Sequence, residues 1–444
     1  MGRYFGTDGY RGVANEGLSA LHAFKIGEAC GELAMSHSKK IVLGQDTRLS
    51  SPLLANALKA GCMSRGCDVY DCGVTSTPCV AYHVTQDDFH FGIMISASHN
   101  PYMDNGIKIF NHQGIKISDD LESYIEDVCD GVIQLPATSS ARIGLDIDFK
   151  HGVDTYVSYL VSTVNQKNET KKVVLDCANG STTTTAQKAF EACGYEVVVI
   201  HNQPDGVNIN THCGSTHPES LQKAVIEHQA FCGFAYDGDG DRLIAVDERG
   251  VIVDGDQIMF ALGKHLKAHD RLHDNLIIAT IMSNLGFMKA CESIGIHVVQ
   301  TQVGDKYVFA KMRETHASLG GEQSGHLILP DLLPSGDGVL ASLQLMDLLI
   351  ESKQTLSSAV SLCQPFPQLL KNIRVKDKHV TMNAQYLKEF VSQVEQELHG
   401  DGRVLVRASG TENLVRVMVE ASTQEKCEHY VNTIIQKIEH EERV

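Results

Sequence analysis

Three aspartates alternate with glycines in the segment Asp237-Gly-Asp-Gly-Asp-Arg242, and this spacing suits metal chemistry. In an extended chain alternate side chains project to one side, so Asp237, Asp239 and Asp241 would converge on one point. Clustered carboxylates repel one another unless a cation joins them, and sites made only of oxygen atoms favour Mg²⁺ or Ca²⁺. The segment predicts a divalent metal site, with Mg²⁺ preferred if the substrate carries phosphate.

Two other interpretations of this segment exist. Asp237, Asp239, Asp241 and Glu248 occupy positions 1, 3, 5 and 12 of an EF-hand calcium loop. Position 6, however, is Arg242 where that loop needs glycine, and both flanks read as strands rather than helices, which disfavours the EF-hand. A solvated Asp-Gly turn would show the same residues and stays an alternative.

A second candidate is the serine in Ile95-Ser-Ala-Ser98-His-Asn-Pro101, where an apolar strand breaks into small polar residues. Ser98 would stand at the end of that strand. A serine hydroxyl is a poor nucleophile unless a neighbour takes its proton or a metal polarises the group that it attacks. No G-x-S-x-G motif surrounds Ser98, so an acyl-transfer serine is not indicated, and a simple turn stays open.

A third candidate is the loop Arg407-Ala-Ser-Gly-Thr-Glu-Asn413, with Arg416 nearby. A guanidinium, two hydroxyls and backbone amides around a glycine are suited to holding phosphate oxygens. A solvated loop has the same composition and stays an alternative. The chain has no G-x-x-x-x-G-K-[ST] motif, which argues against a P-loop ATPase or kinase.

The elements that must position these residues come from a threefold repeat. Each repeat has an apolar strand, a polar loop, a helix, a glycine and a second apolar strand, in residues 39–73, 171–201 and 275–306. Gly66, Gly194 and Gly295 stand where the helix of each repeat would end in a left-handed residue. Each repeat predicts one βαβ unit with a parallel strand pair.

After each repeat comes another strand-like run that ends in a polar loop, in residues 91–101, 231–242 and 317–326. Ligands of open α/β sheets gather at the carboxyl ends of the strands, so these three loops would line one cleft. We predict three similar α/β domains with mixed, largely parallel sheets and a smaller α+β C-terminal domain around that cleft. The predicted domains are residues 1–152, 153–255, 256–366 and 367–444.

Composition limits the function classes. The 444 residues carry 38 basic and 55 acidic side chains, a net charge of −17, so the surface would repel nucleic acid and anionic lipid. Binding of an anionic ligand must rely on a local basic pocket. Neither a signal-peptide pattern nor an apolar run of about 20 residues is visible, and the 13 cysteines show no C-x-x-C. We expect a cytoplasmic protein with reduced thiols and neither nucleic-acid nor membrane partners.

Five motifs together resemble one known family. In chain order they are FGTDGYRG at 5–12, SASHNP at 96–101, DGDGDR at 237–242, GGEQSGH at 320–326 and RASGTEN at 407–413. This set resembles the α-D-phosphohexomutases over the whole chain, and FGTDG and GGEQSGH look most like the phosphoglucosamine mutase branch. The resemblance implies three α/β domains and a smaller phosphate-binding domain, as the repeat also predicts.

The resemblance also implies a role for each matching residue. Ser98 would be the phosphoserine, and Asp237, Asp239 and Asp241 would bind Mg²⁺ together with a phosphate oxygen of Ser98. The remaining roles are sugar binding for Glu322 and Ser324, contacts to the transferring phosphate for Arg11, Lys108 and His326, and contacts to the other phosphate for Arg407, Ser409, Gly410 and Thr411.

The reaction so implied interconverts glucosamine 6-phosphate and glucosamine 1-phosphate through a glucosamine 1,6-bisphosphate, on the route to UDP-N-acetylglucosamine. A phosphomannomutase or phosphoglucomutase differs only at the C2 substituent of the sugar and stays an alternative. A phosphosugar-binding regulator without turnover and a phosphatase are the rivals from other classes. The expected partner is a small phosphosugar, and the expected assembly is a monomer or homodimer.

Overall fold

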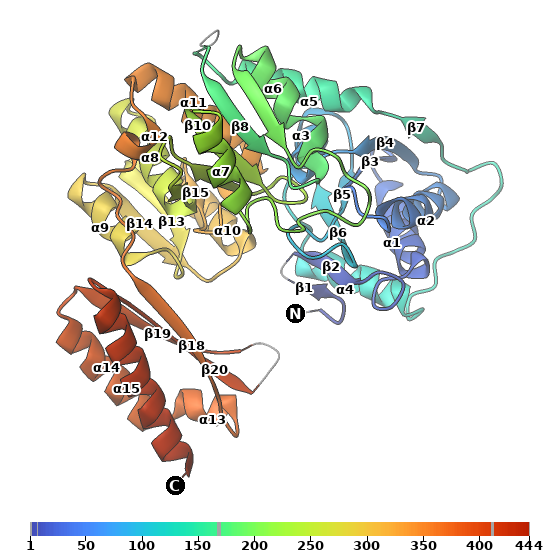
Figure 1. Ribbon diagram of the computed structural model, residues 1–444. Helices are drawn as coiled ribbons and strands as arrows, with labels where there is room; N and C mark the ends of the chain where they lie inside the picture. Colours follow the sequence, from blue (N-terminus) through green and yellow to red (C-terminus); the bar gives the residue numbers. More distant parts are fainter. Residues whose placement is uncertain (1, 7, 167–169, 410–412, 444) are drawn as a thin grey trace. The chain divides into compact units, whose positions relative to one another are not determined.

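The computed structural model describes residues 2–6, 8–166, 170–409 and 413–443. The chain divides into two compact units: Met1–Met282 with Gly295–Ser361, and Ser283–Ile294 with Leu362–Val444. Within the described residues the strands form four sheets, three in the first unit and one in the second (Figure 1).

The first sheet has the strand order β1-β2-β6-β5-β3-β4-β7. Its strands β5, β3, β4 and β7 pair in parallel, and β1, β2, β6 and β5 pair antiparallel. The strands are β1 (Phe5–Gly6), β2 (Gly9–Val13), β3 (Lys40–Gln45), β4 (Asp68–Val74), β5 (Phe91–Ile95), β6 (Asp104–Asn111) and β7 (Asp146–Asp148).

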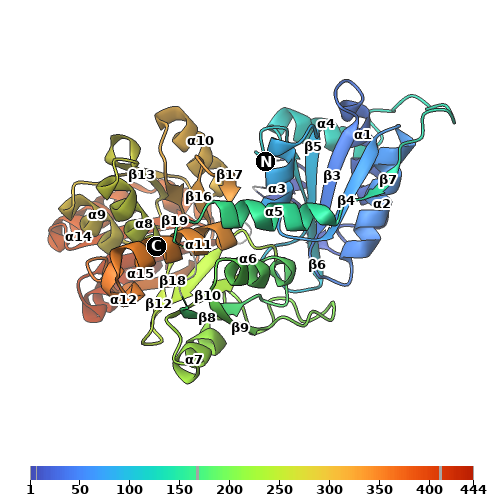
Figure 2. The ribbon, with the colours of Figure 1, turned by 90° about the horizontal axis from the view of Figure 1, so that it is seen from above.

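Helices cover both faces of this sheet, because strand β3 is apolar without interruption. Ile41 and Leu43 point into one core and Val42 into the other, as the two-residue period of a strand requires. Figure 2 shows helices on the two sides of the strands. The first core contains residues of α1 (Ala20–Ala34), α2 (Ser51–Ser64) and α4 (Asp119–Cys129), and the second contains residues of α3 (Thr77–Gln86) and α5 (His151–Ser162).

The second sheet has the order β12-β11-β10-β8-β9. Its strands β10, β8 and β9 are parallel, and β11 and β12 add antiparallel pairs at one edge. The elements are β8 (Lys172–Asp176), η1 (Ser181–Thr184), α6 (Ala186–Ala192), β9 (Glu196–Ile200), α7 (Glu219–Glu227), β10 (Cys232–Tyr236), β11 (Leu243–Val246) and β12 (Ile252–Val253).

The third sheet repeats this plan with the order β14-β13-β15-β16-β17. Strands β14, β13 and β15 are parallel, and β16 and β17 are antiparallel additions. The elements are α8 (Gly255–Ala268), η2 (His273–Asn275), β13 (Leu276–Thr280), β14 (His297–Thr301), α10 (Asp305–Thr315), β15 (Gly320–Gly321), β16 (Leu327–Leu329), β17 (Leu333–Gly336), α11 (Gly338–Ser352) and α12 (Leu356–Ala359).

The three sheets confirm the predicted repeat. Its strand pairs β3/β4, β8/β9 and β13/β14 are all parallel. Gly66, Gly194 and Gly295 have φ angles of +90°, +95° and +69°, the left-handed conformation in which glycine has no Cβ penalty. Strands β5, β10 and β15 run parallel to the first strand of their repeats, so the polar loops that follow them lie at carboxyl ends.

The second unit contains an antiparallel sheet of the order β18-β20-β19. Figure 1 shows α14 and α15 on one face of this sheet, and Leu387, Val394 and Val431 are buried in the core between them. The sequence suggests one helix over residues 381–400, but Ala384 has an extended ψ of 132° and separates two helices. The elements are α9 (Leu285–Ser293), β18 (Gln368–Arg374), α13 (Lys378–Asn383), α14 (Gln385–Leu398), β19 (Gly402–Ala408), β20 (Leu414–Ala421) and α15 (Gln424–Arg443). The predicted boundaries at 152/153, 255/256 and 366/367 stay predictions.

Candidate active site

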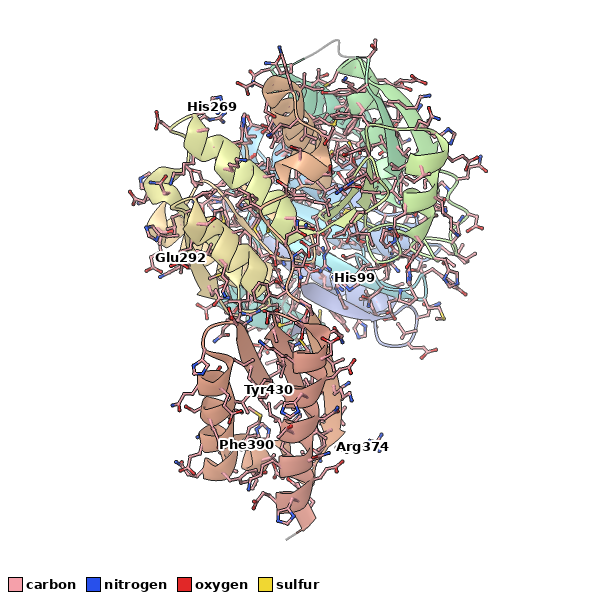
Figure 3. All side chains as sticks on the ribbon, turned by 60° about the vertical axis from the view of Figure 1, so that its left-hand side comes forward. His99, His269, Glu292, Arg374, Phe390 and Tyr430 are labelled. Atoms are coloured by element: carbon pink, nitrogen blue, oxygen red, sulfur yellow. The ribbon has the colours of Figure 1, made fainter. Side chains whose placement is uncertain are left out.

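Ser98 lies in the loop that follows β5, and its backbone has an unusual conformation. Its φ of +54° is left-handed, which costs free energy for a residue other than glycine unless the surroundings enforce it. The hydroxyl donates a 2.5 Å hydrogen bond to Asp237 Oδ2. His99 (Figure 3) places its Nδ1 at 3.3 Å from the same Oγ. Burial, together with Arg242 and Arg11, lowers the pKa of His99 to about 4.

The conformation of the serine loop is enforced by buried polar side chains. The Arg48 guanidinium, fully buried and paired with Asp46 at 2.7 Å, donates to the carbonyl oxygens of Ser98 at 2.8 Å and Asn100 at 3.0 Å. Asn210 Nδ2 donates to the same Ser98 carbonyl at 2.9 Å. These bonds hold the Ser98 backbone from the loops that follow β3 and β9, which fixes the conformation of the serine loop.

The three aspartates that follow β10 are brought together by the fold. Ligand atoms of Asp237, Asp239 and Asp241 all lie within 4.8 Å of one another, and all three side chains are buried. The glycines between them permit this packing. A Cβ on Gly238 would lie 2.5 Å from the Ser98 carbonyl oxygen, and Gly240 has a φ of +76°.

This aspartate cluster fits a divalent cation. Within the described part of the chain, Asp239 Oδ1 and Asp241 Oδ1 are buried and have no hydrogen-bond partner. Burial raises the pKa of Asp237 well above its usual range, and the charges of Asp241 and Asp239 raise it further. A cation coordinated by these two oxygens would relieve this repulsion, and carboxylate oxygens are the ligands that Mg²⁺ and Ca²⁺ prefer.

Lys108, on β6, supplies a positive charge inside the same cluster. Its buried Nζ lies 2.7 Å from Asp239 Oδ2, 3.2 Å from Asp241 Oδ2 and 3.1 Å from Asp8 Oδ2. Burial alone would lower the pKa of Lys108, but these three carboxylates raise it well above its usual range. The lysine is therefore charged and neutralises part of the cluster.

A pocket of about 400 Å³ in the first unit opens beside this cluster. Its lining is strongly charged, with Asp8, Arg11, Arg242, Asp305, Glu322 and His326 among its residues. Glu322 is half-buried, and burial raises its pKa. Ser324 is exposed and is not part of the pocket lining, so the structure does not bring it to the other predicted residues.

Arg11 and His326 add positive charge to the pocket. The Arg11 guanidinium donates to Asp8 and to Asn100 Oδ1, and its Nε is buried without a hydrogen-bond partner among the described residues. His326 lies 3.7 Å from Asp241 and 3.9 Å from Asp305. Burial alone would lower the pKa of His326, but Asp241, Asp305 and Glu322 raise it to about 9. His326 is therefore a cation at neutral pH.

The predicted phosphate loop belongs to the second unit. Arg407 stands directly opposite Arg416 in the β19/β20 pair, and burial together with Arg416 lowers the pKa of Arg407. The backbone of Ser409 is held by Leu414 and by Lys378 Nζ. Gly410 and Thr411 lie outside the described residues. Two guanidinium groups side by side are destabilising by themselves and favour an anionic ligand.

Comparison with known proteins decides the family. Four successive domains match: "Phosphoglucomutase/phosphomannomutase, alpha/beta/alpha domain I" at residues 2–134, domain II at 154–250, domain III at 254–366 and the C-terminal domain at 370–437. The chain belongs to the phosphoglucomutase/phosphomannomutase family. The predicted family and the predicted fold of three α/β domains with a different C-terminal domain are both confirmed.

Relatives in this family extend over the whole chain. Proteins named phosphoglucosamine mutase from Oceanobacillus iheyensis and Bacillus subtilis are each 48% identical, and each match covers 99% of both sequences. Among solved structures, a phosphoglucomutase/phosphomannomutase family protein of Burkholderia thailandensis aligns with a TM-score of 0.81 at 24% identity, covering 99% of this chain and 97% of that chain. An Aspergillus fumigatus N-acetylphosphoglucosamine mutase, solved with GlcNAc-6P and magnesium, aligns with a TM-score of 0.67 at 17% identity, covering 98% and 95%. The two structures show the shared fold.

Sequence reasoning missed several charged residues that lie at the candidate site or hold its loops. Asp8 and Lys116 form an ion pair of 2.6 Å, and Lys116 also pairs with Asp305 at 2.6 Å. Arg48 follows β3, whose carboxyl end lies beside that of β5 in the parallel pair. Ligands gather at the carboxyl ends of strands, and applying this rule also to the first strand of each repeat would have found Arg48.

No helix within the described residues has both the length and the apolar character that a membrane span requires.

Proposed function

We propose that this protein interconverts glucosamine 6-phosphate and glucosamine 1-phosphate through a phosphorylated Ser98. The observation that carries the proposal is the 2.5 Å contact of Ser98 Oγ with Asp237, inside the aspartate cluster and beside the charged pocket. Full-length relatives named phosphoglucosamine mutase support the choice of sugar. The product would feed synthesis of UDP-N-acetylglucosamine.

The proposed reaction consists of two phosphoryl transfers. In the first, the bond from phosphorus to Ser98 Oγ breaks, a bond to the free sugar hydroxyl forms, and the proton of that hydroxyl ends on Ser98 Oγ, which becomes a free serine. The resulting glucosamine 1,6-bisphosphate turns around and returns its other phosphoryl group to Ser98. Phosphoryl transfer is accelerated mainly by positioning and charge neutralisation, which we assign to the cations Arg11, Lys108 and His326.

The other groups bind rather than react. Asp237, Asp239 and Asp241, with a phosphate oxygen on Ser98, would hold Mg²⁺. Bound Mg²⁺ supplies neutralisation of the charge on the transferring phosphoryl group. We assign binding of the sugar hydroxyls to Glu322 and, by resemblance alone, to Ser324. The non-transferring phosphate is assigned to Arg407, Ser409, Gly410 and Thr411, and the paired guanidiniums of Arg407 and Arg416 support this.

An assay of mutase turnover tests the proposal. Conversion of glucosamine 1-phosphate to the 6-phosphate without net release of inorganic phosphate supports it. Stoichiometric release of phosphate into water would identify a phosphatase instead. Binding of the sugar phosphate without any turnover would identify a regulator.

Chelation is expected to stop turnover, and added Mg²⁺ is expected to restore it. Asp239→Asn should raise the Mg²⁺ concentration for half-maximal activity by about tenfold or more, because one of three anionic ligands is lost. The measurement is initial rate against free Mg²⁺ after treatment with excess chelator. Calcium should bind and support turnover poorly, since its bonds are longer and its geometry is looser.

The matched control is Asp247→Asn. Asp247 directly follows β11 and is also a buried carboxylate, but it bonds the Arg249 side chain and the backbone N–H groups of Arg249 and Val251. This variant should keep the wild-type Mg²⁺ dependence. Full activity in excess chelator, or an equal shift in both variants, would contradict the assignment of the metal site.

Glucosamine phosphates are expected to give a higher kcat/KM than the glucose and mannose analogues. The carboxylates of Glu322, Asp8 and Asp305 line the pocket and would attract a protonated 2-amino group. A tenfold preference requires about 1.4 kcal/mol of differential transition-state binding, which one polar contact can supply. The three substrates are compared under identical conditions.

Glu322→Gln tests the role of the pocket in sugar preference separately from phosphoryl transfer. It should reduce the preference for the amino sugar more than it reduces turnover of the glucose analogue. Equal or better turnover of mannose or glucose phosphate by the wild type would contradict the proposed substrate but not the mutase reaction. It would favour the phosphomannomutase or phosphoglucomutase alternative.

A further inference from the structure

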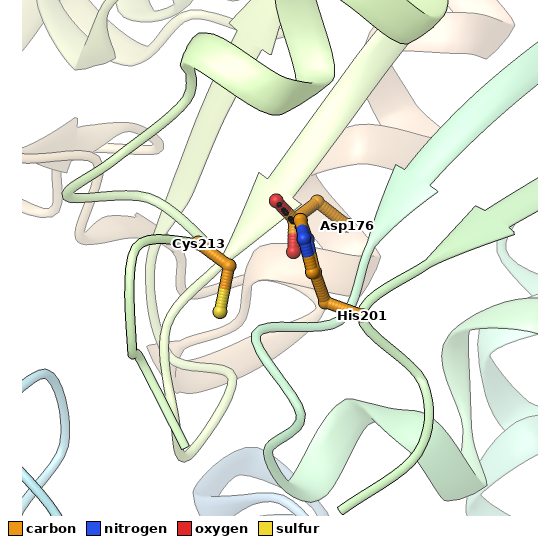
Figure 4. Close-up of side chains that lie close together, drawn as sticks. All are labelled: Asp176, His201 and Cys213. Carbon is orange, nitrogen blue, oxygen red and sulfur yellow. Dashed lines mark ion pairs between the residues drawn. The ribbon is translucent and has the colours of Figure 1, made fainter. Parts of the chain in front are cut away.

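Two clusters outside the active site contain both nitrogen and carboxylate ligands for a metal. In the first, Asp176, His201 and Cys213 come from three segments and face one another (Figure 4). Its carboxylate is already engaged, since Asp176 accepts hydrogen bonds from the backbone N–H groups of Ala178 at 2.9 Å and Gly214 at 3.0 Å and pairs with His201 at 3.0 Å. Burial, with a contribution from Asp176, raises the pKa of the Cys213 thiol to about 12. This cluster joins the end of β8 to two loops, and its thiol stays protonated at neutral pH.

The second cluster lies at the carboxyl ends of α8 and α11. His265 and His269 are four residues apart, so they project from the same side of the helix end, with ring centroids 4.3 Å apart. Glu351, near the end of α11, faces both of them. Its Oε2 lies 3.5 Å from His265 Nε2, and its Oε1 lies 3.0 Å from His269 Nε2.

The tautomer of His269 suits metal binding. Its Nδ1 lies 2.9 Å from the carbonyl oxygen of His265, and only a protonated Nδ1 can make that bond. Nε2 is therefore the atom of the neutral ring that could bind a metal, and it lies 3.0 Å from Glu351 Oε1, a contact that a bound metal would replace. A ring held by its other nitrogen on a backbone carbonyl is the usual support for a metal-binding histidine.

The ligand atoms lie close enough together for one ion, since one ligand atom from each of the three residues lies within 4.8 Å of the other two. His265 Nε2 lies 3.5 Å from Oε2 of Glu351, and His269 Nε2 lies 3.0 Å from its Oε1. Ligand atoms of a tetrahedral Zn²⁺ with bonds of about 2.05 Å are about 3.3 Å apart, so small side-chain shifts would bring both nitrogens and one carboxylate oxygen to this spacing. Glu351 and His269 have 41% and 42% of their side chains exposed, so an ion can enter from solvent and keep water as a further ligand. Two imidazoles with one carboxylate select Zn²⁺ over Mg²⁺.

We propose that His265, His269 and Glu351 form a Zn²⁺ site that joins the ends of α8 and α11. Figure 3 labels His269 at the outer end of α8. At its other end α8 contacts the loop after β15, because Gly255 N–H donates to the Gln323 carbonyl oxygen at 3.0 Å. Bound zinc therefore stabilises the helix pair that supports this loop. The proposal does not depend on the mutase activity.

Titration of the full-length protein with ZnCl₂, in saturating Mg²⁺ to occupy the aspartate cluster, tests this site. We expect His265→Gln/His269→Gln to bind one Zn²⁺ fewer per chain than the wild type and to lose the zinc-dependent rise in Tm. Glu351→Gln, which changes one exposed side chain, should weaken the same binding step by about tenfold or more. With Co²⁺, the wild type should show ligand-field absorption without a thiolate charge-transfer band.

Two control variants are expected to keep wild-type zinc binding. His273→Gln removes an exposed histidine of the same unit that forms an ion pair with its neighbour Asp274 at 3.4 Å. Cys213→Ser tests the first cluster. An unchanged zinc stoichiometry and Tm rise in the double histidine variant would overturn the proposal. So would loss of the binding step in Cys213→Ser, or a wild type that binds no Zn²⁺ in the presence of Mg²⁺.

Discussion

Ser98→Ala is expected to lower mutase turnover by at least about 10³-fold while the fold stays intact, because the side chain that carries the phosphoryl group is lost. The cost in stability should stay near that of one or two hydrogen bonds, about 0.5–1.5 kcal/mol each, since the bonds of Oγ to Asp237 and His99 disappear. The measurements are kcat for glucosamine 1-phosphate and the midpoint of thermal unfolding, both in Mg²⁺.

Mass spectrometry of the intact protein and peptide mapping complete this test. Freshly purified wild type should carry phosphate on Ser98, and Ser96 should carry none, because the Ser96 hydroxyl bonds Asp46 at 2.6 Å whereas the Ser98 hydroxyl bonds Asp237 in the aspartate cluster. Wild-type turnover by Ser98→Ala, or phosphate mapped to Ser96, would refute the proposed phosphoserine. A variant that is inactive and also unfolded would show that Ser98 is required for folding, which contradicts the expected small stability cost.

The parts of the fold that the sequence predicted are those with a local physical cause. Uninterrupted apolar strands require cover on both faces, and glycines at the helix ends adopt the left-handed conformation that other residues avoid. These two rules correctly predicted strands β3, β8 and β13 and the helix ends at Gly66 and Gly194. The break at Ala384 has no such signal, because neither glycine nor proline marks it.

The candidate site was predictable where one segment supplies all the ligands. Asp237, Asp239 and Asp241 are close in sequence, so their convergence follows from an extended chain and two glycines. The partners of this cluster come from elsewhere: Lys108 is more than 120 residues from Asp239, and Asn210 contacts Ser98 from a third loop. Such contacts depend on how the sheets pack on one another, which residue spacing does not encode.

Lys108→Met is expected to have the second large effect, on both stability and turnover. Removing one charge from a buried cluster leaves Asp239 and Asp241 without their ammonium partner, which should cost about 3–5 kcal/mol in the absence of Mg²⁺. Turnover should fall by about 10² or more, because a cation proposed to stabilise the transferring phosphoryl group is lost. Chemical denaturation and steady-state rates measure the two effects.

The matched control is Lys59→Met. Lys59 is also a largely buried lysine between two aspartates, at 2.8 Å from Asp71 and 3.0 Å from Asp146. Its loss should cost less, because Asp146 is 46% exposed and water can solvate it. Turnover of this variant should stay close to that of the wild type.

Magnesium dependence distinguishes a lysine of the metal cluster from an ordinary buried ion pair. Loss of the Lys108 charge makes the cluster more negative, so added Mg²⁺ should bind more tightly and raise Tm more in Lys108→Met than in the wild type. Lys59→Met should show the wild-type rise, because its aspartates are not part of the cluster. An equal magnesium effect on Tm in all three proteins would mean that Lys108 and the metal do not share the carboxylates, and the proposed organisation of the site would be wrong.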